Sequence, residues 1–475
     1  MTGDSLGAGA QPAGPSAASL ETTPLSAKFE LQVADGERGQ LAAAWLWLAI
    51  AALLISGVFS ILLVAARTPF IQDLMPGVDF FRVALVVHVD MSVLVWFAAF
   101  TSVLWSMAGS QRWLGLAWAA WLLAALGTVG MAIAPFVNPG TPIMANYVPV
   151  IDSTLFLWGL TVFGAGFGLT ALRALAVPQR VGLHLAADGA LRFGLNTAAV
   201  AAAMALLALG WSWYKVPVTL DTRTYYELLF WGPGHVIQFC WTLIMLIAWL
   251  WLASLSGARL PLTPRVVVIL FGIGLATVFT TAPIYLAFDV TSVEHQKLFT
   301  WQMRFGGGLA IVPVALAVLI GLFRAERPKG AMHPCHTALL ASLLLFGAGG
   351  VIGFMIQGSD VRVPAHYHGS IVGITLALMG LTYALLPRLG YSAPLPRMAT
   401  WQPAIYGAGQ LMHITGLVWS GGYGVQRKVA GAEQVLRSNS EVAGMALMGA
   451  GGLVAVIGGL IFAVVVLRLL RAGKA

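Results

Sequence analysis

The sequence predicts an all-α polytopic membrane protein with twelve transmembrane helices. Three observations indicate this class. Of the 475 residues, 59% are hydrophobic and only 9% are charged, whereas a soluble chain carries roughly 25% charged residues. The third observation is a series of twelve apolar runs, each long enough to cross a bilayer. The net charge of +8 is not concentrated in any basic run, so nucleic acid is not an expected partner.

The twelve apolar runs follow one another from residue 41 almost to the C-terminus. An even number of helices places both termini on one side of the membrane. If that side is the cytoplasm, the inner segments hold more of the 26 lysines and arginines than the outer segments, as the positive-inside rule requires. The runs cover residues 41–67, 81–108, 113–135, 149–176, 192–212, 225–255, 264–289, 298–323, 336–357, 363–388, 402–423 and 442–471.

Residues 1–40 are expected to form a disordered cytoplasmic tail ahead of a single membrane domain, residues 41–475. Residues 1–27 are rich in Ala, Gly, Pro and Ser and contain no Lys or Arg, which is unlike a signal peptide. Cys240 and Cys335 lie far apart and outside any C-x-x-C pattern. Disulfides, a thiolate zinc site and covalently attached heme are therefore not expected.

The most informative motif is a pair of histidines at the start of the tenth run. His366 and His368 are separated by one residue, so on a helix their side chains point about 200° apart. They cannot chelate one ion together, but they can bind two partners on opposite faces of the helix. Imidazoles at this depth are costly to bury and usually functional.

Histidines on two other predicted helices reach a similar depth. His88 lies near the start of the second run and His235 in the outer half of the sixth. A lone membrane histidine most often hydrogen-bonds a neighbouring helix, and for His413 in the eleventh run both interpretations stay open. For His88 and the His366/His368 pair, ligation of heme iron explains better why these histidines lie at a similar depth. Two imidazoles saturate a heme iron, and a single one leaves an open face for a small molecule.

Heme propionates need cationic partners near the outer surface. Arg67, Arg362, Arg427 and Lys428 lie on that side in the predicted topology. Ordinary anchoring of these side chains at the membrane interface is the alternative interpretation.

Taken together, these residues resemble subunit I of the heme-copper oxidase superfamily, which includes cytochrome c oxidases and nitric oxide reductases. Ala365-His366-Tyr367-His368 resembles the family's A-H-F-H motif. The resemblance implies that His366 is the proximal ligand of a high-spin heme, and that His368 and His88 hold the low-spin heme iron. Gly424–Lys428 is similar to a family stretch whose basic pair binds propionates. Arg67 resembles the family arginine near the low-spin heme.

The segment Phe230–His235 is similar to the family stretch that carries the first copper ligand, so His235 is a residual second-metal ligand by resemblance. Departures from the family follow. Phe239 stands where oxidases have a tyrosine, and Thr281–Tyr285 contains no histidine where the family has a His-His pair. One imidazole cannot form a three-nitrogen copper site, so copper is not expected. Tyr285 and Gln238 are candidate polar groups near the distal face of the high-spin heme.

The resemblance implies a respiratory oxidoreductase of the bacterial or archaeal inner membrane, with two hemes, b-type by default. Electrons would pass from the low-spin heme to the high-spin heme, which would reduce O2 or NO. An alternative is a non-catalytic electron-transfer or gas-binding subunit of a larger complex. Because the chain contains no fused cytochrome c or cupredoxin-type domain, the expected partners besides the lipid bilayer are a donor subunit, soluble cytochrome c or a cupredoxin.

Overall fold

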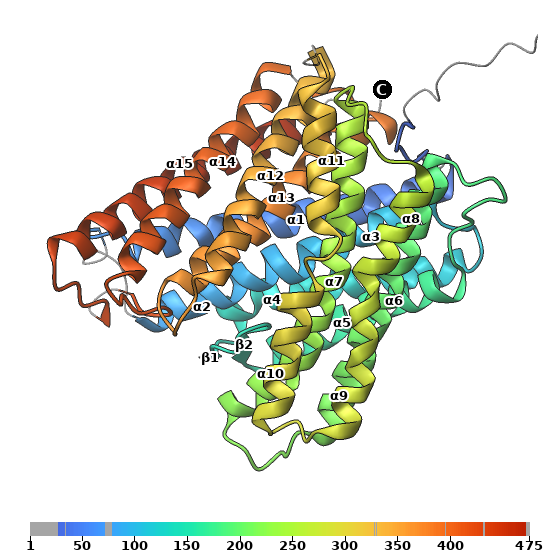
Figure 1. Cartoon of the computed structure of the whole chain (residues 1–475). Helices are drawn as coiled ribbons and strands as arrows, with labels where there is room; N and C mark the ends of the chain where they lie inside the picture. The colour runs from blue at the N-terminus through green and yellow to red at the C-terminus, as the bar shows by residue number, and fades with distance from the viewer. Residues whose placement is uncertain are drawn as a thin grey trace, which may run out of the picture.

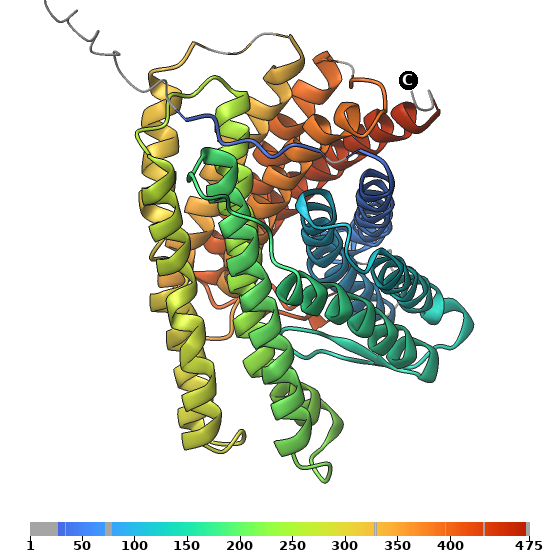
Figure 2. The same ribbon diagram turned by 90° about the vertical axis from the view of Figure 1, so that its right-hand side faces the viewer.

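A computed structural model describes residues 27–33, 35–71, 78–326, 328, 330–394, 396–430 and 433–471. These residues form a bundle of long helices joined by short connections (Figures 1 and 2). The predicted tail falls mostly outside the described residues. Its last part is described: residues 27–33 run along one end of the bundle, where Phe29 is buried and Glu30 forms an ion pair with Arg388.

The helices closely follow the predicted apolar runs. They are α1 (Glu37–Ala65), α2 (Val78–Val89) continuing through η2 (Asp90–Val95) into α3 (Trp96–Ala108), α4 (Leu114–Val137), α5 (Thr154–Ala176), α6 (Ala187–Lys215), α7 (Thr222–Leu255), α8 (Pro264–Ala276) continuing through η3 (Thr277–Thr280) into α9 (Thr281–Ala287), α10 (Val293–Trp301) continuing through η4 (Gln302–Gly306) into α11 (Ile311–Phe323), the short η5 (Gly330–Met332), α12 (His333–Phe354), α13 (Arg362–Arg388), α14 (Pro396–Gly421) and α15 (Asn439–Arg471).

Among the described residues, eleven helices are long and apolar enough to cross a membrane. The twelfth predicted span is α14, whose 26 residues are long enough. Its lower hydropathy reflects polar side chains such as Gln402, Gln410 and His413, which are buried against neighbouring helices. The all-α, twelve-helix prediction is confirmed.

Three of the spans contain turns that are not α-helical. The second span has a π-helical segment, η2, which begins two residues after His88. The seventh has a 3-10 turn, η3, and the eighth a π-helical segment, η4. Gln302 of η4 donates from its amide to the carbonyl of Thr277 and the hydroxyl of Thr281. Polar groups freed by the irregular backbone are thus satisfied inside the protein.

The centre of the bundle is formed by α7 and α13. In their most apolar stretches 83% and 89% of the residues are buried, against 61% or less in the other spans. The two helices pack against each other, and α13 also packs against α12 and α14. Both therefore place their side chains inside the protein, and these are the helices that carry His235 and the His366/His368 pair.

A small antiparallel hairpin was not predicted. Strands β1 (Thr141–Ile143) and β2 (Val150–Asp152) pair between α4 and α5, with Pro142 opposite Ile151. At this same lower end of the bundle in Figure 1, α7, α9 and α10 extend furthest. The C-terminal end of α15 lies at the opposite end in both views.

Candidate functional site

The two histidines of α13 bond to two different neighbouring helices. His366 places Nδ1 2.7 Å from the carbonyl oxygen of Gly349 on α12. His368 places Nδ1 3.3 Å from Oε1 of Gln410 on α14. A carbonyl oxygen can only accept, so each Nδ1 carries the proton and each Nε2 keeps a lone pair. The Nε2 atoms therefore point away from α12 and α14 respectively.

His88 is held in the same way from α1. Its Nδ1 lies 2.9 Å from the Ser56 hydroxyl oxygen and 3.1 Å from the Ser56 carbonyl oxygen, and the Ser56 hydroxyl donates to the His88 carbonyl at 3.0 Å. His88 and His413 are both within electrostatic range of His368. His413 bonds through Nδ1 to the Met448 carbonyl, and its ring centroid is 4.6 Å from that of His368.

These three histidines fit heme ligation. Metal-bound histidines usually donate their second ring nitrogen to a carbonyl or carboxylate, which fixes the tautomer and leaves a basic nitrogen for the metal. His88, His366 and His368 all show this pattern. All three are also half-buried although they lie in the interior of the bundle, so each borders internal space rather than close-packed side chains.

The four predicted cationic side chains differ in the hydrogen-bond and ion-pair partners that they have within the protein. Arg362 forms an ion pair with Asp360 at 2.6 Å. Arg67 bonds to Gln434 and to the Gln426 carbonyl, and burial lowers its pKa to about 10. Arg427 bonds to Ser359 at 3.0 Å. No carboxylate among the described residues pairs with Arg67 or Arg427, so these two remain the better candidates for an anionic partner.

Lys428 points into the protein. Its Nζ donates to the Met144 carbonyl at 2.7 Å and to Oδ1 of Asn146 at 3.0 Å. Its backbone has φ of +61°, in the left-handed region that costs a non-glycine residue energy. Burial lowers the pKa of the Lys428 ammonium to about 8. The two hydrogen bonds attach Lys428 to the loop between β1 and β2.

Two glycines of α7 create room for two tyrosines. A Cβ added at Gly232 would lie 2.1 Å from the Tyr285 hydroxyl, and one added at Gly234 would lie 2.2 Å from Cγ of Tyr147. Tyr147 comes from the hairpin loop and rests over the helix beside His235. The sequence analysis missed this residue, since nothing in the pattern of a short loop shows which helix its side chain reaches.

His235 is engaged at both ring nitrogens. Nδ1 lies 2.7 Å from the Trp231 carbonyl, and Nε2 lies 2.8 Å from the Tyr147 hydroxyl. The second-metal role predicted for His235 would need a free Nε2. Within the described residues no three His, Cys, Asp or Glu side chains are grouped to hold a metal ion. The residues present do not fit the copper centre that the resemblance implies.

Tyr285 and Gln238 occupy different places. Tyr285 stacks on Trp211 with ring centroids 5.2 Å apart and shares a 2.6 Å hydrogen bond with Ser212. His295 packs edge-on against Tyr285 at 4.9 Å and is buried, with no partner for either ring nitrogen. Gln238 lies on α7, three residues after His235, and is half-buried.

One buried carboxylate lies close to His88. Asp90, at the first position of η2, is 1% exposed and neither carboxylate oxygen has a hydrogen-bond partner. Such a group carries a large desolvation cost if charged.

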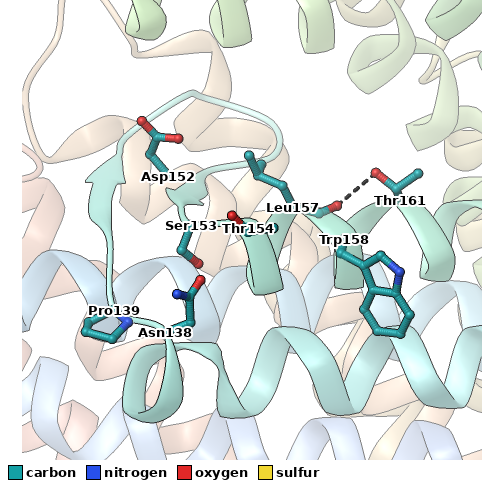
Figure 3. Close-up of a pocket in the computed structure, with 8 residues that line it drawn as sticks. All are labelled: Asn138, Pro139, Asp152, Ser153, Thr154, Leu157, Trp158 and Thr161. Carbon is teal, nitrogen blue, oxygen red and sulfur yellow. Dashed lines mark hydrogen bonds between the residues drawn. The ribbon is translucent and has the colours of Figure 1, made fainter.

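Two cavities open on the hairpin side of the bundle. One, of about 650 Å³, is lined by the end of α4, β2 and the start of α5, and none of the predicted site residues faces it (Figure 3). In Figure 3 Ser153 and Asn138 point toward each other, and Thr161 donates to the Leu157 carbonyl. The other, of about 440 Å³, includes Arg427, Lys428 and Glu227, and Glu227 accepts from the Asn146 backbone.

The fold and the paired histidines define a heme-copper oxidase subunit I-like membrane protein, and comparison with known proteins agrees. The family model described as Cytochrome C and Quinol oxidase polypeptide I matches residues 40–461. The chain belongs to this family. Its fold is similar to a solved heme-copper terminal oxidase dimer, with a TM-score of 0.73 at 16% identity, covering 93% of this chain and 85% of the other.

Relatives in sequence are mostly uncharacterized. The chain is 28% identical to an uncharacterized protein of Rickettsia prowazekii, over 89% of this chain and 94% of the relative. It is 31% identical to an uncharacterized protein of Aquifex aeolicus, over 76% and 88%. The match to cytochrome c oxidase subunit 1 of Thermus thermophilus is 24% identical, over 76% and 71%. Membership of the family supports a respiratory oxidoreductase in general terms.

Proposed function

We propose that this chain is a diheme oxidoreductase of the bacterial or archaeal inner membrane, with both termini in the cytoplasm. His88 and His368 would hold a low-spin heme and His366 a high-spin heme, both b-type. Heme supplies one-electron transfer at a saturated iron and gas binding at an iron with an open position. Electrons would pass from the low-spin to the high-spin heme, and O2 or NO is the proposed substrate.

The observation that carries this proposal is the common orientation of the three imidazoles. Ser56, Gly349 and Gln410 accept from the Nδ1 atoms of His88, His366 and His368. Each acceptor comes from a different helix, so α1, α12 and α14 each fix one ring. A histidine that only joined two helices would be satisfied by this one bond and would not need internal space at its second nitrogen.

The surrounding residues have supporting roles in the proposal. Arg67 and Arg427, which lack a carboxylate partner among the described residues, would bind the propionates. The electron donor would be a partner subunit, a soluble cytochrome c or a cupredoxin, and the bilayer surrounds the helices.

The test is heme and metal analysis of the purified protein, with reduced-minus-oxidised and reduced-plus-CO spectra. We expect two hemes per chain, one of which binds CO. His366→Ala should lose the CO-binding heme, and His88→Ala or His368→Ala the low-spin spectrum. The matched control is His184→Ala, an exposed loop histidine, which should keep both. A purified protein without heme would refute the proposal.

A second candidate is a non-catalytic electron-transfer or gas-binding subunit. The observation that favours it is the missing three-nitrogen site at His235, because a second metal helps to stabilise the bound gas during multi-electron reduction. Turnover decides between the two: rates with O2 or NO above those of His366→Ala support an enzyme, and equal rates with both hemes present support a relay.

A further inference from the structure

Of the three imidazoles proposed to bind iron, that of His368 is oriented by another side chain. Its Nδ1 lies 3.3 Å from Oε1 of Gln410 on α14. His366 and His88 each have a main-chain carbonyl oxygen near Nδ1, at 2.7 Å and 3.1 Å. A main-chain carbonyl is present whatever the side chain, so the acceptor of His368 is the one that a single substitution can remove.

Gln410 lies on a helix that is held closely from two sides. It is 9% exposed, and α14 packs against both α15 and α12 (Figure 1). A Cβ added at Gly409 would lie 2.8 Å from Cα of Ala455 on α15, and one added at Gly407 would lie 3.0 Å from Cβ of Ala341 on α12. The glycines therefore let α14 approach both neighbours closely, which fixes the main chain that carries the Gln410 amide.

The hydrogen bond to Gln410 changes how strongly His368 can bind iron. When Nδ1 donates to an oxygen, Nε2 becomes a more basic ligand. Ferric iron carries one more positive charge than ferrous iron, so a more basic ligand stabilises the ferric form more and lowers the reduction potential. A carboxylate would strengthen Nε2 further, but it would place a costly charge inside the membrane. The glutamine amide lowers the potential without adding a charge.

We propose that Gln410 is a positioning residue that lowers the reduction potential of the iron held by His368, and so favours the transfer of its electron to the second heme. His413 lies one turn further along α14, with its ring centroid 4.6 Å from that of His368. Its Nδ1 is directed to the Met448 carbonyl, so it does not compete for the Gln410 oxygen. The inference rests on the proposed function, since it requires a low-spin heme at His368.

The test is a spectroscopic redox titration of the low-spin heme in the whole protein. Gln410→Leu removes the acceptor and should raise the midpoint potential. If the lost bond weakens binding to ferric iron about tenfold more than binding to ferrous iron, the rise is about 59 mV for this one-electron couple. Gln410→Asn keeps an amide but places it one methylene further from the imidazole, so it should shift the potential in the same direction.

Gln402→Leu is the matched control, since Gln402 is a buried glutamine of the same helix whose amide contacts Tyr383 and Met379 instead. It should leave the potential unchanged. An unchanged or lower potential in Gln410→Leu, or an equal rise in Gln402→Leu, would overturn the inference, while a retained low-spin spectrum leaves the proposed function standing. If Gln410→Leu does not hold the heme, Gln410→Asn is compared with Gln402→Asn by the same criterion. Absence of a low-spin heme in the unmodified protein would instead refute the proposed function itself.

Discussion

Replacing Gly349 with alanine tests how tightly α12 supports His366. Gly349 lies where α12 crosses α13, and a Cβ added there would be 2.4 Å from the Ser370 nitrogen and 2.7 Å from the Gly369 carbonyl carbon. These are backbone atoms, which cannot rotate away. Ordinary contact begins at 3.4 Å, so the two helices must separate locally by about 1 Å, at a cost of about 1–3 kcal/mol.

The separation acts directly on the heme ligand. The carbonyl of Gly349 accepts from Nδ1 of His366 at 2.7 Å, and a 1 Å displacement lengthens this bond to about 3.7 Å, beyond hydrogen-bonding distance. Loss of such an orienting bond typically weakens metal binding by about 10–100-fold. His368, which is held from α14, should be affected much less. We therefore expect Gly349→Ala to lose CO-binding heme selectively.

The assay is heme content and CO-binding amplitude per chain at matched protein concentration. Gly347→Ala is the control, because it lies on the same helix and its added Cβ would meet no atom within 4 Å. That variant should keep both hemes and should be unchanged or more stable by up to about 1 kcal/mol, as alanine favours a helix. Full retention of CO-binding heme in Gly349→Ala would refute the argument.

Three further predictions follow from individual side chains. Asp90→Leu should raise the thermal unfolding midpoint, by about 1–3 kcal/mol in stability, because it removes a buried carboxylate without partners; a lower midpoint would contradict this. His368→Ala should lose the low-spin spectrum whereas His413→Ala keeps it, and the reverse result would assign the ligand to α14. Lys428 has a folded pKa of about 8, below its unfolded value of 10.5, so its burial cost is fully present below pH 8 and disappears as pH rises toward 10.5. Relative to Lys428→Met, the protein should gain about 1–2 kcal/mol over that range, after allowance for partial exposure, measured by unfolding at several pH values.

Hydropathy was sufficient to locate the helices, because most of the residues in a spanning segment are apolar. The prediction of 264–289, for example, corresponds to α8 through α9, Pro264–Ala287. It could not show the non-α turns η2, η3 and η4, since these depend on contacts between helices such as that of Gln302 with Thr277. The hairpin of β1 and β2 was missed because three-residue strands leave no periodic pattern.

The histidines were predictable for a different reason. A one-residue spacing fixes the angle between His366 and His368 on any helix, and the structure directs them to α12 and α14 accordingly. The surroundings of His235 were not predictable, because Tyr147 is distant in sequence. The contacts of Lys428 with the hairpin loop likewise depend on where two remote loops meet.

The placement of Tyr147 over Gly234 limits how a three-imidazole metal site could be built at His235. Introducing histidines into Thr281–Tyr285 would not by itself create a three-imidazole metal centre, because the His235 lone pair would still be bound to the phenol. The phenol would have to be removed first, and a bulkier residue at Gly234 would be one way to displace it. Neither change alone would yield a metal site, so building one at this place would require both.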